Sequence, residues 1–206
     1  MGEITAITPQ VKDKKRCNIF VDGRFCCGLT LETAVKNRLK VGVNITEEQL
    51  ADMQLESEKE KALDKALTHI SATQKTEKQV RTFLAGKGYL PAVVDYAIEK
   101  LRSYNFLNDG QYAETYVECV SKRKGSKLIR MELKGKGISD EEIDGALDKL
   151  SPELERETAV ALLEKYMRGK TWDKATLQKA CRYLLGKGYD YEIVKSALRD
   201  YGEDEE

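Results

Sequence analysis

The sequence predicts a mainly α-helical protein, with three tandem three-helix repeats forming an elongated solenoid after a small N-terminal β-hairpin module. Three observations predict this fold class. First, residues 80–101 recur without a gap as residues 129–150 and 180–201, at offsets of 49 and 51 residues. Second, every copy has a Gly-Lys-Gly triplet between two apolar patterns of helical period. Third, residues 1–29 instead have the alternating, β-branched composition of strands.

Each repeated stretch reads as a helix, a glycine stop and a second helix. Glycine accepts the left-handed backbone conformation that often ends a helix, so the Gly-Lys-Gly triplets, 86–88 in the first copy, are expected to stop the helices. The following helices have different start signals: Pro91 at a first helical position, Ser139 with Glu142 as a capping box, and Asp190 as an N-cap. An alanine shared by all copies indicates close helix packing.

A third helix precedes each pair, so the unit has about fifty residues and three helices. The preceding helices are expected at roughly 64–71 (continuing upstream), 109–122 and 152–168. The aligned residues Thr76, Gly125 and Thr176 are expected to cap the middle helices. One unit cannot bury its apolar face alone, so neighbouring units are expected to stack.

The N-terminal segment predicts a hairpin of 16–21 and 24–27, with Asp22-Gly23 as its two-residue turn. Residues 4–8 can supply a third strand, because an isolated hairpin is only marginally stable. Thr30 starts a short helix, and Thr46 with Gln49 starts a long one. The expected divisions are 1–45 for the hairpin module and short helix, 46–107 for the long helix and repeat one, 108–151 for repeat two, 152–202 for repeat three, and a disordered acidic tail at 203–206.

The composition favours a folded helical protein. The 206 residues include 35 basic and 35 acidic ones, so the formal net charge is zero. No apolar run is long enough to span a membrane and the N-terminus does not resemble a signal peptide, so we expect a cytoplasmic protein that binds no membrane. The five cysteines match no metal-ligand spacing and are expected to be buried or half-buried; the single histidine, His69, is expected to be structural or at the surface.

No set of residues predicts catalysis. The sequence has no phosphate-binding loop of the P-loop type, no dinucleotide fingerprint and no metal-binding helix motif. The Gly-Lys-Gly triplet is too short for a phosphate loop and follows a helix instead of preceding one. We therefore expect a protein that is not an enzyme and needs no cofactor or metal.

Basic residues are concentrated in one stretch, 122–136, which holds a single acidic residue, Glu132. Spacings of three and four place Lys127, Arg130 and Lys134 on one face of the middle helix of repeat two. Such a run is often only a solvated helix face. Recurrence favours a binding surface, because a triplet occupies the same positions in two copies. The candidate filament- or DNA-binding residues are Lys75, Lys78, Arg81, Lys122, Arg123, Lys124, Lys127, Arg130, Lys134 and Lys136.

The triplet is absent from the third copy. Lys75, Lys78 and Arg81 align with Lys124, Lys127 and Arg130, whereas repeat three has Ala175, Gln178 and Cys181. Stacked units would place the two triplets along one side of the solenoid, where a basic strip favours a polyanion or an acidic protein groove. The lysines within the glycine triplets are interpreted as structural, since a helix C-terminus favours a cation.

The repeats resemble the RecX family of recombinase regulators over about residues 60–201. The resemblance lies in Leu107-Asn108-Asp109 with Tyr112-Ala113, in the stretch GSKLIRMEL (125–133), and in Lys136-Gly137-Ile138. Residues 1–45 resemble the N-terminal extension of some members. The chain departs from the family at 69–71, where many members have an arginine, so no role of that arginine is transferred.

The resemblance implies a cytoplasmic protein that binds the RecA filament, lies along its groove, and restrains its ATPase and strand-exchange activities. Contacts to single- or double-stranded DNA within the filament are also implied. We expect a monomer. An independent DNA-binding or architectural protein using the same basic strip is the alternative, followed by a helical-repeat scaffold for another protein.

Overall fold

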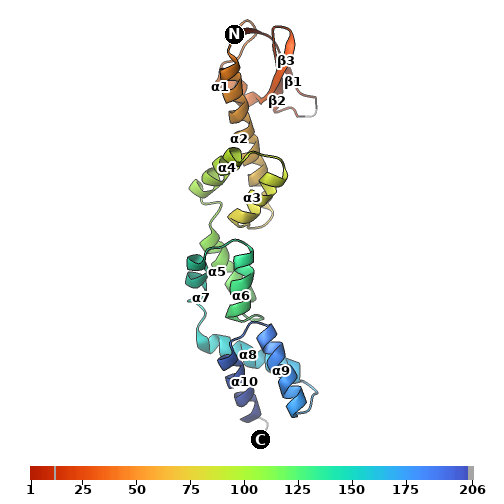
Figure 1. The fold of residues 1–206 in the computed structure, drawn as a ribbon, viewed down its shortest axis with the longest axis vertical. Coiled ribbons are helices and arrows are strands. Elements are labelled where there is room, and N and C mark those ends of the chain that lie inside the picture. Colours follow the sequence, from red (N-terminus) through yellow and green to blue (C-terminus); the bar gives the residue numbers. More distant parts are fainter. Residues whose placement is uncertain (12, 204–206) are drawn as a thin grey trace. The chain divides into compact units, whose positions relative to one another are not determined.

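The fold is that of a computed structural model that describes residues 1–11 and 13–203, with side chains placed up to residue 201. Four strands and ten helices follow one another in these residues (Figure 1): β1 (Gly2–Pro9), β2 (Arg16–Val21), β3 (Arg24–Thr30), α1 (Leu31–Lys36), β4 (Asn44–Ile45), α2 (Glu47–Ser71), α3 (Glu77–Gly86), α4 (Pro91–Ser103), α5 (Asp109–Val120), α6 (Ser126–Gly135), α7 (Asp140–Leu147), α8 (Pro152–Met167), α9 (Lys174–Gly186) and α10 (Tyr191–Glu203). The mainly α prediction, with a small N-terminal strand module and three three-helix repeats, is confirmed. Among the described helices, none combines the length and the apolarity that crossing a lipid bilayer requires.

The chain folds as two compact units. One comprises residues 1–74 and 80–107, and the other comprises residues 75–79 together with residues from 108 onward. The first residues of α3 therefore belong with repeat two, although the rest of α3 belongs with repeat one. The division of the chain into five segments, as expected from the sequence, stays a prediction.

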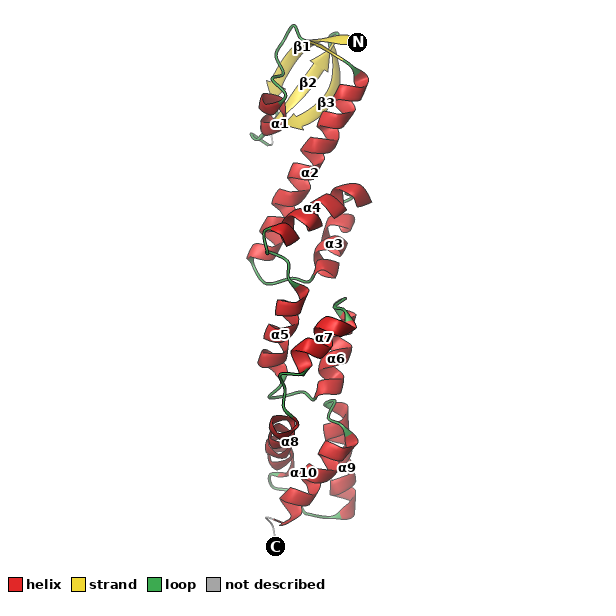
Figure 2. Ribbon diagram, turned by 90° about the vertical axis from the view of Figure 1, so that its left-hand side faces the viewer, coloured by secondary structure: helices red, strands yellow, loops and turns green. Residues whose placement is uncertain are grey.

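The N-terminal module is an antiparallel sheet in the order β3-β2-β1-β4, seen in yellow in Figure 2. The predicted hairpin and its third strand, β1, are both present. Asp22 and Gly23 have positive φ values of 48° and 77°, as a two-residue hairpin turn requires. The sequence did not predict β4, because two residues carry no periodicity and pair only through β1.

A polar network attaches the sheet to α2. The backbone N–H of Thr30 donates to Oγ of Ser57 at 2.8 Å, and the Thr30 hydroxyl donates to Oε2 of Glu60 at 2.6 Å. Thr33, which is fully buried, donates to the same carboxylate oxygen at 3.0 Å. Hydrogen-bonding partners offset the cost of burying these polar groups.

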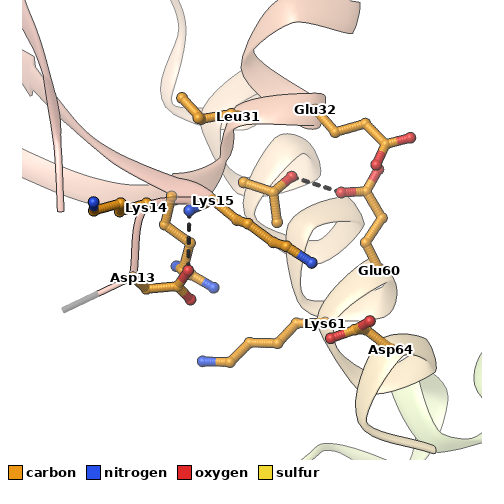
Figure 3. Close-up of a pocket in the computed structure, with 10 residues that line it drawn as sticks. Asp13, Lys14, Lys15, Leu31, Glu32, Glu60, Lys61 and Asp64 are labelled. Carbon is orange, nitrogen blue, oxygen red and sulfur yellow. Dashed lines mark hydrogen bonds between the residues drawn. The ribbon is translucent and has the colours of Figure 1, made fainter. Parts of the chain in front are cut away.

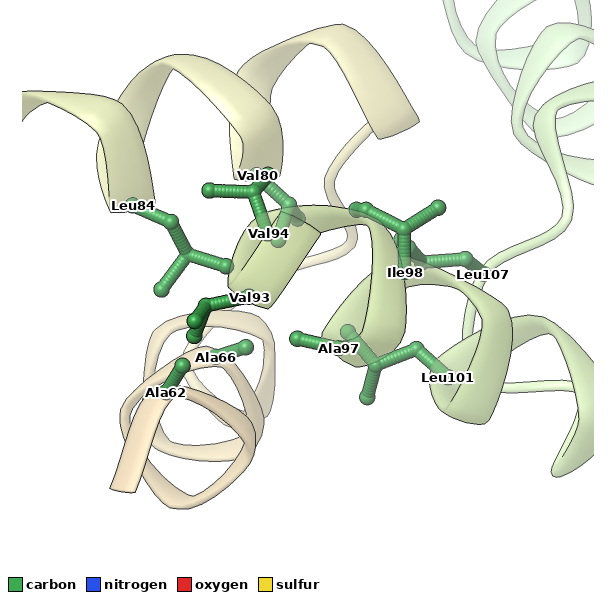
Figure 4. Packing of buried hydrophobic residues seen from close by; sticks show 10 residues of the cluster. All are labelled: Ala62, Ala66, Val80, Leu84, Val93, Val94, Ala97, Ile98, Leu101 and Leu107. Carbon is green, nitrogen blue, oxygen red and sulfur yellow. The ribbon is translucent and has the colours of Figure 1, made fainter. Parts of the chain in front are cut away.

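Within each repeat, the first and third helices pack closely through the shared alanine. Figure 4 shows this in repeat one, where Ala97 of α4 faces Ala62 and Ala66 of α2 and all three are fully buried. The equivalent residues of the other repeats, Ala146 and Ala197, are buried as well. The small side chains allow the helix backbones to approach, as the sequence suggested.

Most helix boundaries follow the predicted caps, with two corrections. Both capping boxes, at Thr46 and at Ser139, are present. The middle helix of repeat three, however, begins after Asp173 and not at Thr176, because the Asp173 carboxylate accepts the Thr176 N–H at 2.8 Å. Helix α10 continues to residue 203, so the tail expected to be disordered is partly helical; its residues 204–206 lie outside the described part.

The cysteines only partly match expectation. Cys17 and Cys27 are buried in the strand module, and Cys181 is half-buried, but Cys26 and Cys119 are exposed. Burial raises the pKa of the Cys27 thiol to about 11, which makes it a small inert hydrophobe. Among the described residues, no group of three or more His, Cys, Asp or Glu could hold a metal ion.

Candidate functional site

The Gly-Lys-Gly turns form joints between successive repeats. The hydroxyl of Thr76, just before α3, donates to the Lys136 carbonyl at 2.8 Å. At the next joint the N–H of Gly125, just before α6, donates to the Lys187 carbonyl at 2.9 Å. The start of one middle helix thus docks on the glycine turn of the following repeat, a role that local sequence reasoning did not assign to these glycines.

An acidic side chain completes each joint. The backbone N–H of Glu77, at the start of α3, donates to Oδ1 of Asp109 in α5 at 3.0 Å. Likewise Ser126, at the start of α6, donates to Glu155 of α8 at 2.7 Å. A carboxylate at a helix N-terminus satisfies an orphan donor and complements the helix dipole. The joints therefore fix where the basic residues of each middle helix lie.

The predicted basic face of α6 exists. Ile129 and Leu133 are fully buried, which directs Lys127, Arg130 and Lys134 away from the core. The exposed fractions of these three basic side chains are 65%, 38% and 51%. A solvent-accessible row of cations is thus present in repeat two.

Acidic side chains accompany every member of this row. Lys127 Nζ lies 2.5 Å from Asp190 Oδ2, across the joint to repeat three. Arg130 forms an ion pair with Asp144 and lies 4.0 Å from Asp140, and Lys134 Nζ lies 2.7 Å from Asp140 Oδ1. The hydrogen bond from Lys127 lowers the pKa of Asp190, so this carboxylate stays charged in mild acid. A polyanion would have to displace these acidic partners.

The recurrence of the arginine has a structural basis. Arg81 Nη1 lies 2.5 Å from Asp95 Oδ1 in repeat one, and the Arg130–Asp144 pair occupies the same positions 49 residues later. In repeat three both partners change together, to Cys181 and Lys195. The arginine therefore links the middle helix to the third helix, and its loss accompanies the loss of its partner.

The recurrence of the lysine has a similar basis in the joint. Lys78 Nζ donates to the Gly135 carbonyl at 3.1 Å, and Lys127 reaches Asp190 across the next joint. Repeat three has Gln178 at this position, so the lysine recurs in the two repeats where it contacts the following repeat. These contacts give the recurrence of the lysine in repeats one and two a structural basis.

Lys124 belongs to a cluster closed by one carboxylate. Its Nζ lies 2.6 and 2.7 Å from the two oxygens of Glu132, which also accepts the Tyr116 hydroxyl at 2.6 Å. The hydrogen bond to Glu132 raises the pKa of Lys124. Burial would raise the pKa of Glu132, but the hydrogen bonds from Lys124 and Tyr116 outweigh burial and lower it. This cation is therefore neutralised within repeat two.

The other predicted residues lie at the edges of this face. Lys122 and Arg123 are exposed in the turn after α5, and neither forms an ion pair with a described residue. Lys136 lies over the Tyr116 ring at 5.4 Å, and Lys75 is half-buried before α3. The structure thus places the ten predicted residues in two groups: most have acidic or backbone partners, whereas Lys122 and Arg123 do not.

A basic cleft in repeat three was missed by sequence reasoning. It has a volume of about 460 Å³ and lies between α8 and α9, and no carboxylate of a described residue lines it. Its lining consists of Arg123, Leu162, Lys165, Tyr166, Lys170, Tyr183 and Lys187. These cations are dispersed along the sequence, so no charge run marks them. One signal was available: Tyr183 aligns with Glu132, the carboxylate that closes the cluster in repeat two.

Comparison with known proteins identifies the family. Models of the regulatory protein RecX N-terminal domain and of the first, second and third RecX three-helix domains match residues 2–46, 62–101, 108–147 and 153–198. The chain belongs to the RecX family. The matched segments include the strand module, so the N-terminal residues are a RecX domain and not an unrelated addition.

Curated relatives and solved structures agree with this assignment. Regulatory protein RecX of Clostridium perfringens (strain 13 / Type A) is 36% identical over 203 residues, covering 97% of this chain and 96% of the relative. The RecX of Clostridium beijerinckii is 34% identical with 97% and 95% coverage. A crystal structure of regulatory protein RecX has a TM-score of 0.78 at 28% identity, covering 97% of this chain and all of that chain. The RecX structure from Lactobacillus salivarius has a TM-score of 0.65 at 28% identity, with 69% and 96% coverage.

A second cleft of the RecX fold lies in the N-terminal unit, where the strand module meets α2. Figure 3 shows that acidic and basic side chains alternate around it, with Asp13 beside Lys14 and Lys15, Asp64 beside Lys61, and Glu32 and Glu60 on the far side. The Glu60 carboxylate already accepts hydrogen bonds from the Thr30 and Thr33 hydroxyls. Because its charges are balanced and the Glu60 carboxylate already accepts hydrogen bonds from the protein, we interpret this cleft as structural. The cleft of repeat three differs, because its charged lining residues are all basic.

Proposed function

We propose that this RecX-family chain binds RecA nucleoprotein filaments and restrains their recombinase and ATPase activities during DNA repair. The observation that carries the proposal is the match of RecX domains along nearly the whole chain. The proposal includes action as a cytoplasmic monomer, with DNA within the filament as a further contact. Exposed cations along α6 support it, because a polyanionic filament attracts such a face.

The filament-facing surface is proposed to include the predicted basic residues, with their ion pairs exchanged on binding. Exposed ion pairs contribute little, typically about 0.2–1 kcal/mol, so replacing an internal carboxylate by a phosphate or an external carboxylate costs little. The acidic partners also orient the cations before binding. We therefore expect binding through Lys127 and Arg130 to be sensitive to salt.

Reversal of Lys127 and Arg130 to Glu tests this surface. We expect filament affinity to fall by about tenfold, because two attractions become repulsions. Sequence reasoning alone suggests unchanged folding, since both side chains lie off the apolar stripe. The ion pairs lead us to expect a modest loss of stability instead, because the new glutamates would face Asp190 and Asp144.

A charge swap provides the control. Exchanging Arg130 and Asp144 retains an ion pair between α6 and α7 while moving the positive charge to the other helix. Filament affinity is measured by co-sedimentation with RecA assembled on single-stranded DNA, with thermal unfolding of each variant. If the swap variant and the reversed variant both bind as the unmodified chain does, the basic strip is not the filament surface.

Regulation is proposed to occur through binding and not through a catalytic centre of this chain. ATP turnover should change only when RecA is present, and purified chain alone should hydrolyse no ATP. A turnover signal that co-purifies with the chain, and survives further purification, would contradict this.

Independent DNA binding is the second candidate function, and the basic cleft of repeat three is the observation that favours it. The two functions differ in one measurement. A filament regulator sediments with RecA filaments far better than with naked DNA, whereas an independent DNA-binding protein does so equally with both.

A further inference from the structure

The cleft of repeat three differs from the other basic regions in its charge balance. Four cations line it, and none of them forms an ion pair with a described residue: Arg123, Lys165, Lys170 and Lys187. By contrast, each cation along α6 has a carboxylate within 4.0 Å. Like charges without counter-charges repel one another, so an arrangement of this kind gains free energy when an anion enters it.

Aromatic rings, not carboxylates, hold two of these cations. Tyr166 and Tyr183 stack with their ring centroids 4.7 Å apart. Lys170 Nζ lies 3.2 Å from the Tyr166 centroid, and Lys187 Nζ lies 5.5 Å from that of Tyr183. A cation–π contact positions an ammonium group without neutralising its charge. These lysines are thus oriented and still available to an anion.

The joint between repeats two and three completes the cleft. The hydrogen bond from Gly125 to the Lys187 carbonyl ties the turn that carries Arg123 to the turn that carries Lys187. Arg123 thereby reaches the cleft from the preceding repeat, while Lys165 and Tyr166 come from α8. The cations are preorganised by the fold, which reduces the entropy cost of binding.

We propose that this cleft binds the backbone phosphates of a single-stranded nucleic acid. Lysines bind phosphates as point charges, and Tyr hydroxyls and Arg side chains are common donors to phosphate oxygens. The combination of a positive groove with aromatic rings is typical of single-strand binding. It favours a nucleic acid over an acidic protein segment, which offers carboxylates but no bases to contact the rings.

The proposal rests on the proposed function only for the source of the strand, a recombinase filament. The test therefore uses free oligothymidylate of about 16 nucleotides, which is enough for one binding site, and no recombinase. If the unmodified chain binds the strand but not the filament, the result contradicts the proposed function alone. If the unmodified chain does not bind the strand, the result contradicts this inference.

The variant is the full chain with Lys165→Glu and Lys170→Glu. A matched control carries Lys179→Glu and Lys195→Glu, which change the net charge equally on exposed positions of α9 and α10 outside the cleft. Fluorescence anisotropy with the labelled strand should show an affinity loss of about tenfold or more for the cleft variant and less than about threefold for the control. The salt dependence should also decrease, by a slope of about 1.4 for two lost phosphate contacts.

Equal losses in both variants would overturn the proposal, because they would report net charge and not a site. A competition experiment distinguishes a single strand from the other possible ligands of the cleft, an acidic protein segment and a duplex. The proposal requires oligothymidylate to displace the labelled strand far better than polyglutamate or a duplex of the same charge does. Equally effective polyglutamate would indicate an acidic protein partner, and a preferred duplex would indicate a double-stranded one; either result overturns the proposal. Thermal unfolding of both variants confirms that they are folded.

Discussion

Repeats two and three have the same three-helix arrangement, the same Gly-Lys-Gly turn and an alanine at the same position. They differ in whether acidic side chains accompany their basic side chains. In repeat two, Glu132 closes the cluster around Lys124, and aspartates accompany the cations of α6. In repeat three, Tyr183 occupies the position of Glu132, and among the residues that the structure describes none contributes a carboxylate to the cleft of the neighbouring cations. The comparison teaches that the fold sets the positions of the side chains, while the residues at aligned positions, with Glu132 replaced by Tyr183 and Lys124 by Ala175, set the local charge balance.

The largest expected effect comes from the joint that both repeats share. A Cβ on Gly188 would lie 2.4 Å from the Leu128 backbone nitrogen, and its φ is +88°. A Cβ on Gly137 would lie 2.6 Å from Cβ and Cδ of the Lys78 side chain, and one on Gly88 would meet nothing within 4 Å. We expect Gly88→Ala to cost about 1 kcal/mol from backbone strain alone, Gly137→Ala about 2, and Gly188→Ala about 4.

Chemical unfolding of the three alanine variants measures this series. Gly88→Ala is the matched control, since it has the same backbone conformation, with a φ of +85°, and no neighbour. Equal destabilisation at all three positions would show that backbone strain alone acts there and that the joints contribute nothing.

The next largest expected effect on stability comes from the cluster of Lys124, Glu132 and Tyr116 in repeat two. This effect depends on pH. The folded pKa of Glu132 is lowered, so its stabilisation is present above its unfolded value and is lost as the pH falls through its folded value. Glu132→Gln should therefore cost about 1.5 kcal/mol at neutral pH, the value of a charged hydrogen bond, and almost nothing in strong acid.

Urea unfolding of Glu132→Gln and the unmodified chain at neutral and acidic pH tests this expectation. The difference between the two proteins, not their absolute stability, is the informative quantity, because other carboxylates are protonated in both. A difference that stays constant down to low pH would mean that the Glu132 charge does not stabilise the cluster.

The smallest expected effect concerns the ion pair that repeats one and two share and repeat three lacks. A double-mutant cycle on Arg130 and Asp144 should give a coupling of about 0.5 kcal/mol, since both side chains are partly exposed. The same cycle on Arg81 and Asp95 should give a similar value. Installing Cys181→Arg in repeat three should give no gain, because Lys195 stands there at the position of the acidic partner, Asp144 in repeat two. A coupling of zero in both cycles would remove the structural account of the arginine's recurrence.

Local signals made much of the fold predictable. Capping boxes such as Ser139 with Glu142 act within one helical turn, and the hairpin turn at 22–23 depends on two residues, so each could be identified from the sequence. The start of α9 was misplaced because two cap residues compete within four positions, and Asp173 forms the stronger set of contacts. Short β4 depends on pairing with a distant strand and has no local signal.

The site was less predictable, because charge balance depends on contacts between helices. The run of cations in residues 122–136 was visible, but its partners include Asp190, which lies 63 residues beyond Lys127 and meets it only across a joint. The alignment did contain a sign that Arg130 and Asp144 form a pair, because both residues are replaced together in repeat three. The basic cleft assembles residues from three helical regions, so only the aligned replacement of Glu132 by Tyr183 indicated it.

The central claim is that the residue at position 132 in repeat two, and at the aligned position 183 in repeat three, decides which repeat binds an anion. Adding a carboxylate to the cleft of repeat three tests this claim most directly. Affinity for single-stranded oligothymidylate is measured for Tyr183→Glu, with Gln178→Glu as the control that adds the same charge to an exposed position of α9. The account predicts that Tyr183→Glu weakens binding by about tenfold, that Gln178→Glu changes it by less than about threefold, and that Glu132→Tyr strengthens it by freeing Lys124. Equal affinities for Tyr183→Glu and Gln178→Glu, both folded, would contradict the account.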